Sequence, residues 1–272
     1  MILLNGLPED RISVLDRGLQ YGDGLFETMV YRANTIEFLD LHLSRLMLAC
    51  KRLNIEFEQI QVLKSELDSV CKFLSDNNAV IKIIITRGSG GRGYLATTGI
   101  EPTRIISTHE LPRYPTDNVN RGVKLRLCAH TLSENVALAG IKHLNRLDQV
   151  LARNEWHDPD IAEGLMQNSA GNIIEGTMSN VFTVKDGRIF TPMLDRAGVA
   201  GIIRAKVISL AIEQNLSIDE CTMTYDDVLS ADEVFITNSV IGLWPVNAIS
   251  GKSFSVGPIT QTIQTALQQA QK

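Results

Sequence analysis

The sequence has few cysteines, and they follow no recognisable pattern. Cys50, Cys71, Cys128 and Cys221 are the only four in 272 residues, spaced 21, 57 and 93 positions apart. This spacing fits neither a zinc-ligand motif nor the dense disulfide framework of a small secreted domain. We therefore expect reduced, mostly buried thiols and no bound metal.

Long apolar runs and an excess of positive charge are also missing. Residues 1–6 contain no basic segment and only three consecutive aliphatic residues, so we expect neither a signal peptide nor a membrane span, and a cytoplasmic protein. The net charge is −5 and each half of the chain is slightly acidic, which argues against a nucleic-acid partner. With 44% hydrophobic residues, the chain is long enough for one large or two modest cores.

Hydrophobic periodicity divides the chain into two α+β domains. In residues 1–110 it predicts strands at 25–31, 79–86 and 104–108 and helices at 40–53 and 60–74. Two prolines and polar turn formers predict a linker at 111–120. Residues 121–272 then form a second domain, with strands at 123–127, 218–223 and 233–237, a hairpin at 181–190 around Asp186-Gly187, and helices at 141–156, 202–213 and 259–270.

The glycine-rich segment 88–93 matches the G-x-G-x-x-G pattern of dinucleotide-binding proteins. In that motif the glycines open a helix whose N-terminus meets the pyrophosphate. Residues 94–102 have no helical stripe and end in proline, so the pattern favours a flexible loop. Arg87 and Arg92 lie in or beside this loop, which could present an arginine to a substrate carboxylate.

Gly198-Val199-Ala200-Gly201 directly precedes a predicted helix and is a candidate anion site, because free N–H groups at a helix start attract phosphate. Arg45, off the core face of the helix at 40–53, is a candidate cation for such a group. Both features also have ordinary explanations: a glycine turn into a helix, and a solvated surface arginine. The residues alone leave these alternatives open.

Two further residues suggest chemistry. Lys142 follows the uncharged run 135–141, and a lysine in apolar surroundings can act as an imine-forming nucleophile or proton carrier. Glu175 is a single acid in a small-residue turn between apolar strands. A snorkelling lysine and a turn carboxylate that binds backbone N–H groups would look the same.

Five segments together resemble the fold-type IV pyridoxal-phosphate enzymes, the class-IV aminotransferase superfamily. They are Tyr21-Gly22-Asp23-Gly24-Leu25-Phe26-Glu27-Thr28, residues 42–46, residues 140–147, Glu175-Gly176-Thr177-Met178-Ser179-Asn180 and residues 198–204. The resemblance spans nearly the whole chain. It implies an α+β, two-domain fold with a smaller N-terminal α/β sandwich and a larger C-terminal β-barrel-like domain with helices, assembled as a homodimer.

The resemblance also implies roles for the candidate residues, with pyridoxal 5′-phosphate as cofactor. Lys142 would hold the cofactor as a Schiff base, and Glu175 would pair with its pyridine nitrogen. The phosphate would be bound by Arg45, by the N–H groups of Ile202 and Ile203, and by the turn Thr237-Asn238-Ser239.

Segments 87–94 and 139–147 look most like the folate-pathway lyases of this superfamily, which make 4-aminobenzoate and pyruvate. Branched-chain and D-amino-acid aminotransferases carry tyrosines where this chain has Leu147 and Phe26, respectively, so the resemblance favours the lyases and leaves an aminotransferase as the alternative. Lys142 would move the proton, with Thr28 as a candidate hydroxyl on its path. Arg92 and Arg146 are candidates for binding the substrate carboxylates.

Two readings from other classes rest on single features. A nicotinamide oxidoreductase would depend on the glycine-rich segment 88–93, and a metabolite-binding module without catalysis would depend on the helix start at Gly201. A visible absorption spectrum separates them from a pyridoxal-phosphate enzyme, because only the latter is yellow.

Overall fold

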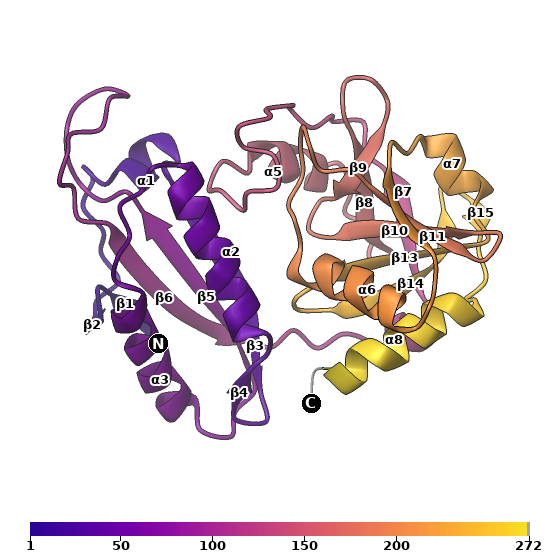
Figure 1. The fold of residues 1–272 in the computed structure, drawn as a ribbon, viewed down its shortest axis with the longest axis horizontal. Helices are drawn as coiled ribbons and strands as arrows, with labels where there is room; N and C mark the ends of the chain where they lie inside the picture. The colour runs from indigo at the N-terminus through magenta and orange to yellow at the C-terminus, as the bar shows by residue number, and fades with distance from the viewer. Residues whose placement is uncertain (271–272) are drawn as a thin grey trace. The chain divides into compact units, whose positions relative to one another are not determined.

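The computed structural model describes residues 1–270, which divide into two compact units (Figure 1). The first unit contains Met1–Pro112 and Ile141–Asn145, and the second contains Arg113–Gly140 and the chain from Arg146 onward. The division after Pro112 falls inside the segment predicted as a linker. The return of five later residues to the first unit differs from the predicted division.

The first unit is an antiparallel six-stranded sheet in the order β2-β1-β6-β5-β3-β4. Its strands are β1 (Ile2–Leu4), β2 (Leu7–Pro8), β3 (Gly24–Arg32), β4 (Thr35–Ile36), β5 (Ala79–Thr86) and β6 (Thr103–Glu110). Its helices are α1 (Arg17–Tyr21), α2 (Leu39–Arg52) and α3 (Ile60–Leu74).

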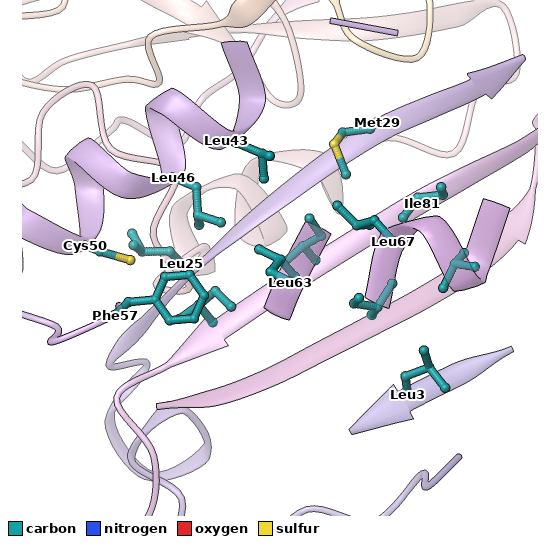
Figure 2. Packing of buried hydrophobic residues seen from close by; sticks show 14 of the residues in the cluster. Leu3, Leu25, Met29, Leu43, Leu46, Cys50, Phe57, Leu63, Leu67 and Ile81 are labelled. Atoms are coloured by element: carbon teal, nitrogen blue, oxygen red, sulfur yellow. The ribbon is translucent and has the colours of Figure 1, made fainter. Parts of the chain in front are cut away.

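The core of this unit lies between one face of the sheet and the helices α2 and α3 (Figure 2). Alternate residues of β3 and β5, such as Met29 and Ile81, point to this face because side chains alternate along a strand. Leu43 and Leu46 of α2 and Leu63 of α3 meet them from the helix side. The predicted helical and strand periodicities of this domain are confirmed.

The predicted helix at 141–156 is wrong in its first half. The helix α5 covers only Leu147–Arg153, and the segment Ile141–Asn145 is extended along the free edge of β3. Ile141 is 2% exposed and belongs to the core of the first unit. The apolar residues in this segment therefore pack along a sheet edge and not on a helix face. Here pairing with a distant strand overrides the local periodicity.

The second unit is built on a nine-stranded mixed sheet in the order β12-β11-β10-β13-β14-β7-β8-β9, with β15 paired to β14. Its strands are β7 (Val123–Leu127), β8 (Ile161–Gln167), β9 (Ile173–Gly176), β10 (Asn180–Lys185), β11 (Arg188–Pro192), β12 (Ile218–Cys221), β13 (Glu233–Asn238), β14 (Gly242–Ile249) and β15 (Lys252–Ser253). Its helices are α4 (Asp117–Asn120), α5, α6 (Ile202–Glu213), α7 (Tyr225–Ser230) and α8 (Pro258–Ala270).

The predicted hairpin, α6 and α8 are confirmed. Asp186 and Gly187 both have positive φ, 48° and 76°, as the two-residue turn between β10 and β11 requires. The strands β8, β9 and β14 had no counterpart in the sequence prediction. No helix within residues 1–270 is long and apolar enough to cross a membrane.

Candidate active site

Lys142 is held at the edge of the first sheet by backbone hydrogen bonds. Its carbonyl accepts a bond from the Phe26 N–H at 3.0 Å, and the Leu144 N–H donates to the Gly24 carbonyl at 3.0 Å. Its amino nitrogen Nζ lies 4.2 Å from the centre of the Phe26 ring. The lysine is thus fixed beside β3 by the segment whose fold the sequence did not predict.

Thr28 lies on the same face of β3 as Phe26, because the two are two residues apart. Lys82, which faces Thr28 across the β3–β5 pair, also approaches the Phe26 ring, with Nζ 5.2 Å from its centre. The structure therefore places Lys142 Nζ against the Phe26 ring and Thr28 on the same face of β3 as that ring. It adds a second lysine to that face.

On the opposite face, Glu27 is buried beneath α2 between two basic side chains. His42 Nδ1 lies 2.6 Å from Glu27 Oε2, and Arg45 donates to both carboxylate oxygens at 2.8 and 2.5 Å. Burial acts to raise the pKa of Glu27, but hydrogen bonds from His42 and Arg45 outweigh it and hold that pKa below its usual value. Glu27 is therefore a charged carboxylate that orients both partners.

His42 is the neutral member of this cluster. Burial lowers its pKa, and the positive charges of Arg45 and Lys142 act in the same direction against the opposing effect of Glu27. A neutral imidazole facing a carboxylate donates its Nδ1–H. Arg45 is the basic side chain whose guanidinium Glu27 orients. Its predicted binding of the phosphate stays a prediction.

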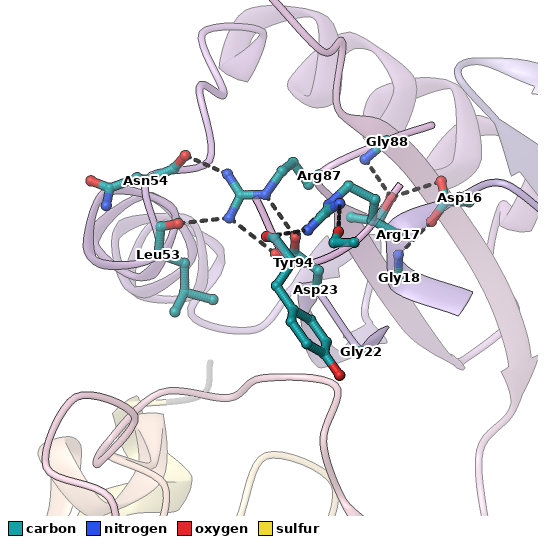
Figure 3. Close-up of polar contacts among 12 residues, drawn as sticks. Asp16, Arg17, Gly18, Gly22, Asp23, Leu53, Asn54, Arg87, Gly88 and Tyr94 are labelled. Carbon is teal, nitrogen blue, oxygen red and sulfur yellow. Dashed lines mark hydrogen bonds and ion pairs between the residues drawn. The ribbon is translucent and has the colours of Figure 1, made fainter. Parts of the chain in front are cut away.

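The glycine-rich loop does not open a helix, so it is not a dinucleotide cradle. Its neighbour Arg87 is bound to Asp23, with Nε 2.7 Å from Oδ2 (Figure 3). Arg17 donates to the same carboxylate and to the carbonyl of Tyr94, which anchors the loop. Arg92 itself is exposed, so its predicted contact with a substrate carboxylate stays a prediction.

Asp23, the acid of the Gly-Asp-Gly motif, is the centre of this anchor. Burial acts to raise its pKa, but hydrogen bonds from Arg87 and Arg17 outweigh that effect and lower the pKa. Arg87 also donates to the carbonyls of Leu53 and Asn54 at the end of α2. The motif residue therefore ties the loop to the end of α2.

In the second unit, Glu175 is buried at the end of β9, 4% exposed. Its Oε2 accepts the Val199 N–H at 2.8 Å, and the Gln149 amide lies 3.4 Å from Oε1. Burial lowers the pKa of Arg146, whereas the charges of Glu175 and Asp148 act to raise it. Two predicted site residues, Glu175 and Arg146, therefore share one electrostatic environment.

The helix α6 begins without a capping side chain. Its N-cap is Gly201, and the N–H groups of Ile202 and Ile203 lie in its first turn, where no intrahelical acceptor exists. Asn180 donates to the Val199 carbonyl at 2.9 Å, and its Oδ1 occupies the space that a Cβ on Gly201 would need. A glycine is thus required here, and the helix start is open to an anion.

Thr237 adds an unused hydroxyl near this helix start. It lies opposite Asn180 in the β10–β13 pair and is fully buried, and its Oγ1 has no hydrogen-bond partner among residues 1–270. A buried hydroxyl without a partner is costly, and a bound ligand would supply the missing bond. The open helix start and this hydroxyl fit a phosphate group.

Asn238 shapes the turn that follows Thr237. Its Oδ1 accepts the N–H groups of Val240 and Ile241 at 2.8 and 2.9 Å, and its amide donates to the Met178 carbonyl. The side chain is thus committed to the turn. A phosphate contact of Asn238 and Ser239 stays a prediction.

Sequence reasoning gave no role to Glu27 or Gln149, whereas the resemblance included Thr237 in the phosphate-binding turn 237–239. For Glu27 a signal was available: it is a single charge inside the apolar run 24–31, and such a residue is buried only with partners. Gln149 carried no signal, because a glutamine in a helix is ordinary.

Comparison with known proteins adds the family. The model of the class-IV amino-transferases matches residues 24–249. The chain belongs to this family. It is 37% identical over 270 residues to an aminodeoxychorismate lyase of Vibrio harveyi, covering 97% of this chain and 98% of the relative.

Solved structures agree with this assignment. The crystal structure of 4-amino-4-deoxychorismate lyase from Pseudomonas aeruginosa is 42% identical and covers 99% of this chain and 98% of its own, with a TM-score of 0.95. A branched-chain amino acid aminotransferase of Escherichia coli is 25% identical, covers 100% and 94%, and has a TM-score of 0.88. The expected fold-type IV architecture and its cofactor, pyridoxal 5′-phosphate, are confirmed.

Proposed function

We propose that this chain is an aminodeoxychorismate lyase, which converts 4-amino-4-deoxychorismate to 4-aminobenzoate and pyruvate for folate biosynthesis. The observation that carries the proposal is the full-length likeness to lyases at 37% and 42% identity, against 32%, 30% and 25% for three aminotransferases that the chain also matches over nearly its full length. The residues gathered in each unit supply the parts that this chemistry needs.

Each part of the cofactor has a matching group in the chain. Lys142 would hold it covalently, Glu175 would pair with its ring nitrogen, and Arg45 would bind its phosphate together with the start of α6 and Thr237. Bound there, pyridoxal phosphate supplies an electron-poor ring that accepts the electron pair of a broken C–H bond. Glu175 would support this chemistry by keeping the ring nitrogen protonated.

In this reaction Lys142 would act first as a base and then as an acid. Its free amine takes the proton from the amine-bearing carbon of the substrate. The C–O bond of the enolpyruvyl ether then breaks, the six-membered ring becomes aromatic, and the protonated lysine assists the leaving pyruvate enol. Thr28 provides a hydroxyl on the same face of β3, and Arg92 and Arg146 are the candidate partners of the two substrate carboxylates.

Two positions support a lyase over an aminotransferase. Leu147 begins α5 and is 74% exposed, and Phe26 has no hydroxyl and contacts Lys142 Nζ. Both stand where the aminotransferases of the resemblance carry tyrosine. Elimination also yields an aromatic product, which makes it strongly downhill compared with returning the proton to the cofactor.

The deciding experiment incubates the purified protein with 4-amino-4-deoxychorismate and measures 4-aminobenzoate and pyruvate. Equal amounts of both products are expected. In parallel, branched-chain amino acids and D-alanine are offered with 2-oxoglutarate. Turnover of these amino acids at about 1–10³ s⁻¹ with no 4-aminobenzoate would establish the aminotransferase alternative instead.

The proposal includes a cytoplasmic homodimer. The compartment is proposed from the few, widely spaced cysteines of the sequence. A twofold dimer would let the loop at 88–93 reach the partner's pocket. Light scattering at assay concentration should give twice the chain mass of 30.0 kDa, and an active monomer would refute the dimer.

A further inference from the structure

Glu163 is a buried acid that the reaction proposed above does not use. It lies on β8, is 1% exposed and receives five hydrogen bonds, all from neutral donors. Its Oε1 accepts from the N–H groups of Gly164 and Thr177 at 2.8 and 3.0 Å and from the Thr177 hydroxyl at 2.5 Å. Its Oε2 accepts from the Met178 N–H at 3.1 Å and from the Ser179 hydroxyl at 2.9 Å.

Four of these five donors belong to the turn 177–179, which links β9 to β10. The chain packs so closely around the carboxylate that a Cβ on Gly176 would lie 2.9 Å from the Glu163 carboxyl carbon. Hydrogen bonds to a charged acceptor are about twice as strong as neutral ones, so this turn has one well-defined shape. Without the acid, its buried donors would lose their acceptor.

The residues on both sides of this turn, Glu175 and Asn180, form hydrogen bonds with the backbone of Val199. Glu175, before the turn, accepts the Val199 N–H at 2.8 Å, and Asn180, after it, donates to the Val199 carbonyl at 2.9 Å. Val199 lies in the glycine turn that leads into α6. The turn around Glu163 therefore sets the spacing between the Glu175 carboxylate and the start of α6.

We propose that Glu163 is a positioning residue for cofactor binding. Through the turn 177–179 it fixes Glu175 and Asn180, and so the separation between the acid for the ring nitrogen and the helix start for the phosphate. This rests on the proposed function only in assigning those two groups to pyridoxal phosphate. Glu163 itself contacts no reacting atom.

The test is Glu163→Gln, which keeps the shape but turns an amide NH₂ toward donors. The dissociation constant of pyridoxal phosphate, measured by titrating the apoprotein, should rise about tenfold or more, by analogy with the loss of metal affinity when the partners of metal-ligating side chains are removed. The visible band of the bound cofactor and its pH midpoint should also shift, because Glu175 is no longer held at the ring nitrogen. Glu163→Asp keeps the charge and should recover part of both effects.

Glu233→Gln is the matched control in the same unit. Glu233 is 5% exposed and accepts the N–H groups of Thr260 and Ile259 at 2.7 and 3.3 Å, where α8 begins. It should lose thermal stability like Glu163→Gln but keep the wild-type cofactor affinity and spectrum. A folded Glu163→Gln protein with wild-type affinity and spectrum would overturn the proposal.

If Glu163→Gln does not fold, Thr177→Val and Ser179→Ala each remove one donor hydroxyl. Each should weaken cofactor binding a few-fold, and unchanged binding in both would overturn the proposal. Failure of the proposed function looks different: a wild-type protein that binds pyridoxal phosphate but makes no 4-aminobenzoate refutes only the lyase. A wild-type protein that binds no pyridoxal phosphate refutes both.

Discussion

Each unit buries a carboxylate almost completely, and the two carboxylates are compensated in different ways: Glu27 of the first unit by basic side chains, and Glu163 of the second by neutral dipoles. Glu27 is compensated by the Arg45 guanidinium and the His42 ring. Glu163, equally buried at 1% exposure, is compensated within residues 1–270 only by N–H and O–H groups. Both arrangements satisfy the hydrogen bonding of a buried carboxylate. They differ in what happens when one partner is removed by substitution.

Removing a charge from the first unit leaves another full charge without a partner, which is the costly case for a buried ion pair. Removing a neutral donor from the second unit leaves a carboxylate with its remaining hydrogen bonds. Substitutions in the first unit should therefore have large effects that depend on charge and pH. Substitutions in the second should have smaller effects that depend on shape.

Lys142→Ala should give the largest effect, because it removes both the covalent anchor and the base. We expect activity to fall by at least a thousandfold, at the upper range of general base loss. In the wild type, borohydride reduction and peptide mapping should place a phosphopyridoxyl group on Lys142. Lys82→Arg is the control, since Lys82 approaches the same Phe26 ring and should not be labelled. A label on Lys82, Lys124, Lys185 or Lys206 would refute the assignment.

Glu27→Gln should come next. Losing the buried charge that pairs with the partly buried Arg45 should cost about 3–5 kcal/mol of stability. It should also weaken pyridoxal phosphate binding about tenfold, because Arg45 is no longer oriented. Pyridoxal without the phosphate should be bound as by the wild type.

Glu66→Gln is the control that sharpens this comparison. Glu66 and Arg104 form another buried pair in the first unit, with 2.8 Å between Oε1 and Nη2, joining α3 to β6. Glu66→Gln should lower the free energy of unfolding about as much as Glu27→Gln does, without any change in cofactor affinity. If both variants weaken cofactor binding equally, Glu27 acts only through stability.

Acid pH should destabilise the first unit before the second. His42 has a lowered pKa in the fold, so below its ordinary value of 6.5 the unfolded chain binds the extra proton and stability falls. Glu27, whose pKa is also lowered, contributes a second loss as the pH falls below 4.5. The melting temperature of the apoprotein should drop by a few degrees between about pH 7.5 and 5.5. His42→Gln should flatten this first drop, and an unchanged drop would show that other groups cause it.

The same comparison explains what could be predicted from the sequence. The α2 and α3 stripes and the Asp186-Gly187 hairpin were predictable because local periodicity and turn chemistry decide them. Several strands of the second unit, among them β8 and β14, could not be predicted from local sequence. β8 carries Glu163 and Gly164, and β14 carries Pro245, residues that are unfavourable in strands and are accepted here for tertiary reasons.

Motifs and the family resemblance were sufficient to predict the site residues. They did not predict the residues that hold these side chains in place. Lys142 and Glu175 stand in recognisable segments. The pairing of Lys142 with the edge of β3 depends on contacts between residues more than a hundred positions apart, which no local pattern encodes. Four of the five hydrogen bonds that Glu163 accepts depend in the same way on the turn 177–179, which links β9 to β10.

Thr237→Val should give the smallest effect and tests the neutral half of the comparison most directly. The substitution removes a buried hydroxyl that has no partner within residues 1–270, so the apoprotein should be as stable as the wild type or slightly more stable. If that hydroxyl serves the phosphate, the dissociation constant of pyridoxal phosphate should rise about tenfold, the value of one hydrogen bond to a charged group, while pyridoxal is bound unchanged. Thr260→Val is the matched control, because Thr260 is also fully buried with an unpartnered Oγ1, but lies on α8. Isothermal titration of the two apoproteins should separate them: equal affinities for pyridoxal phosphate would mean that the Thr237 hydroxyl is a packing feature, and that the open start of α6 binds the phosphate without it.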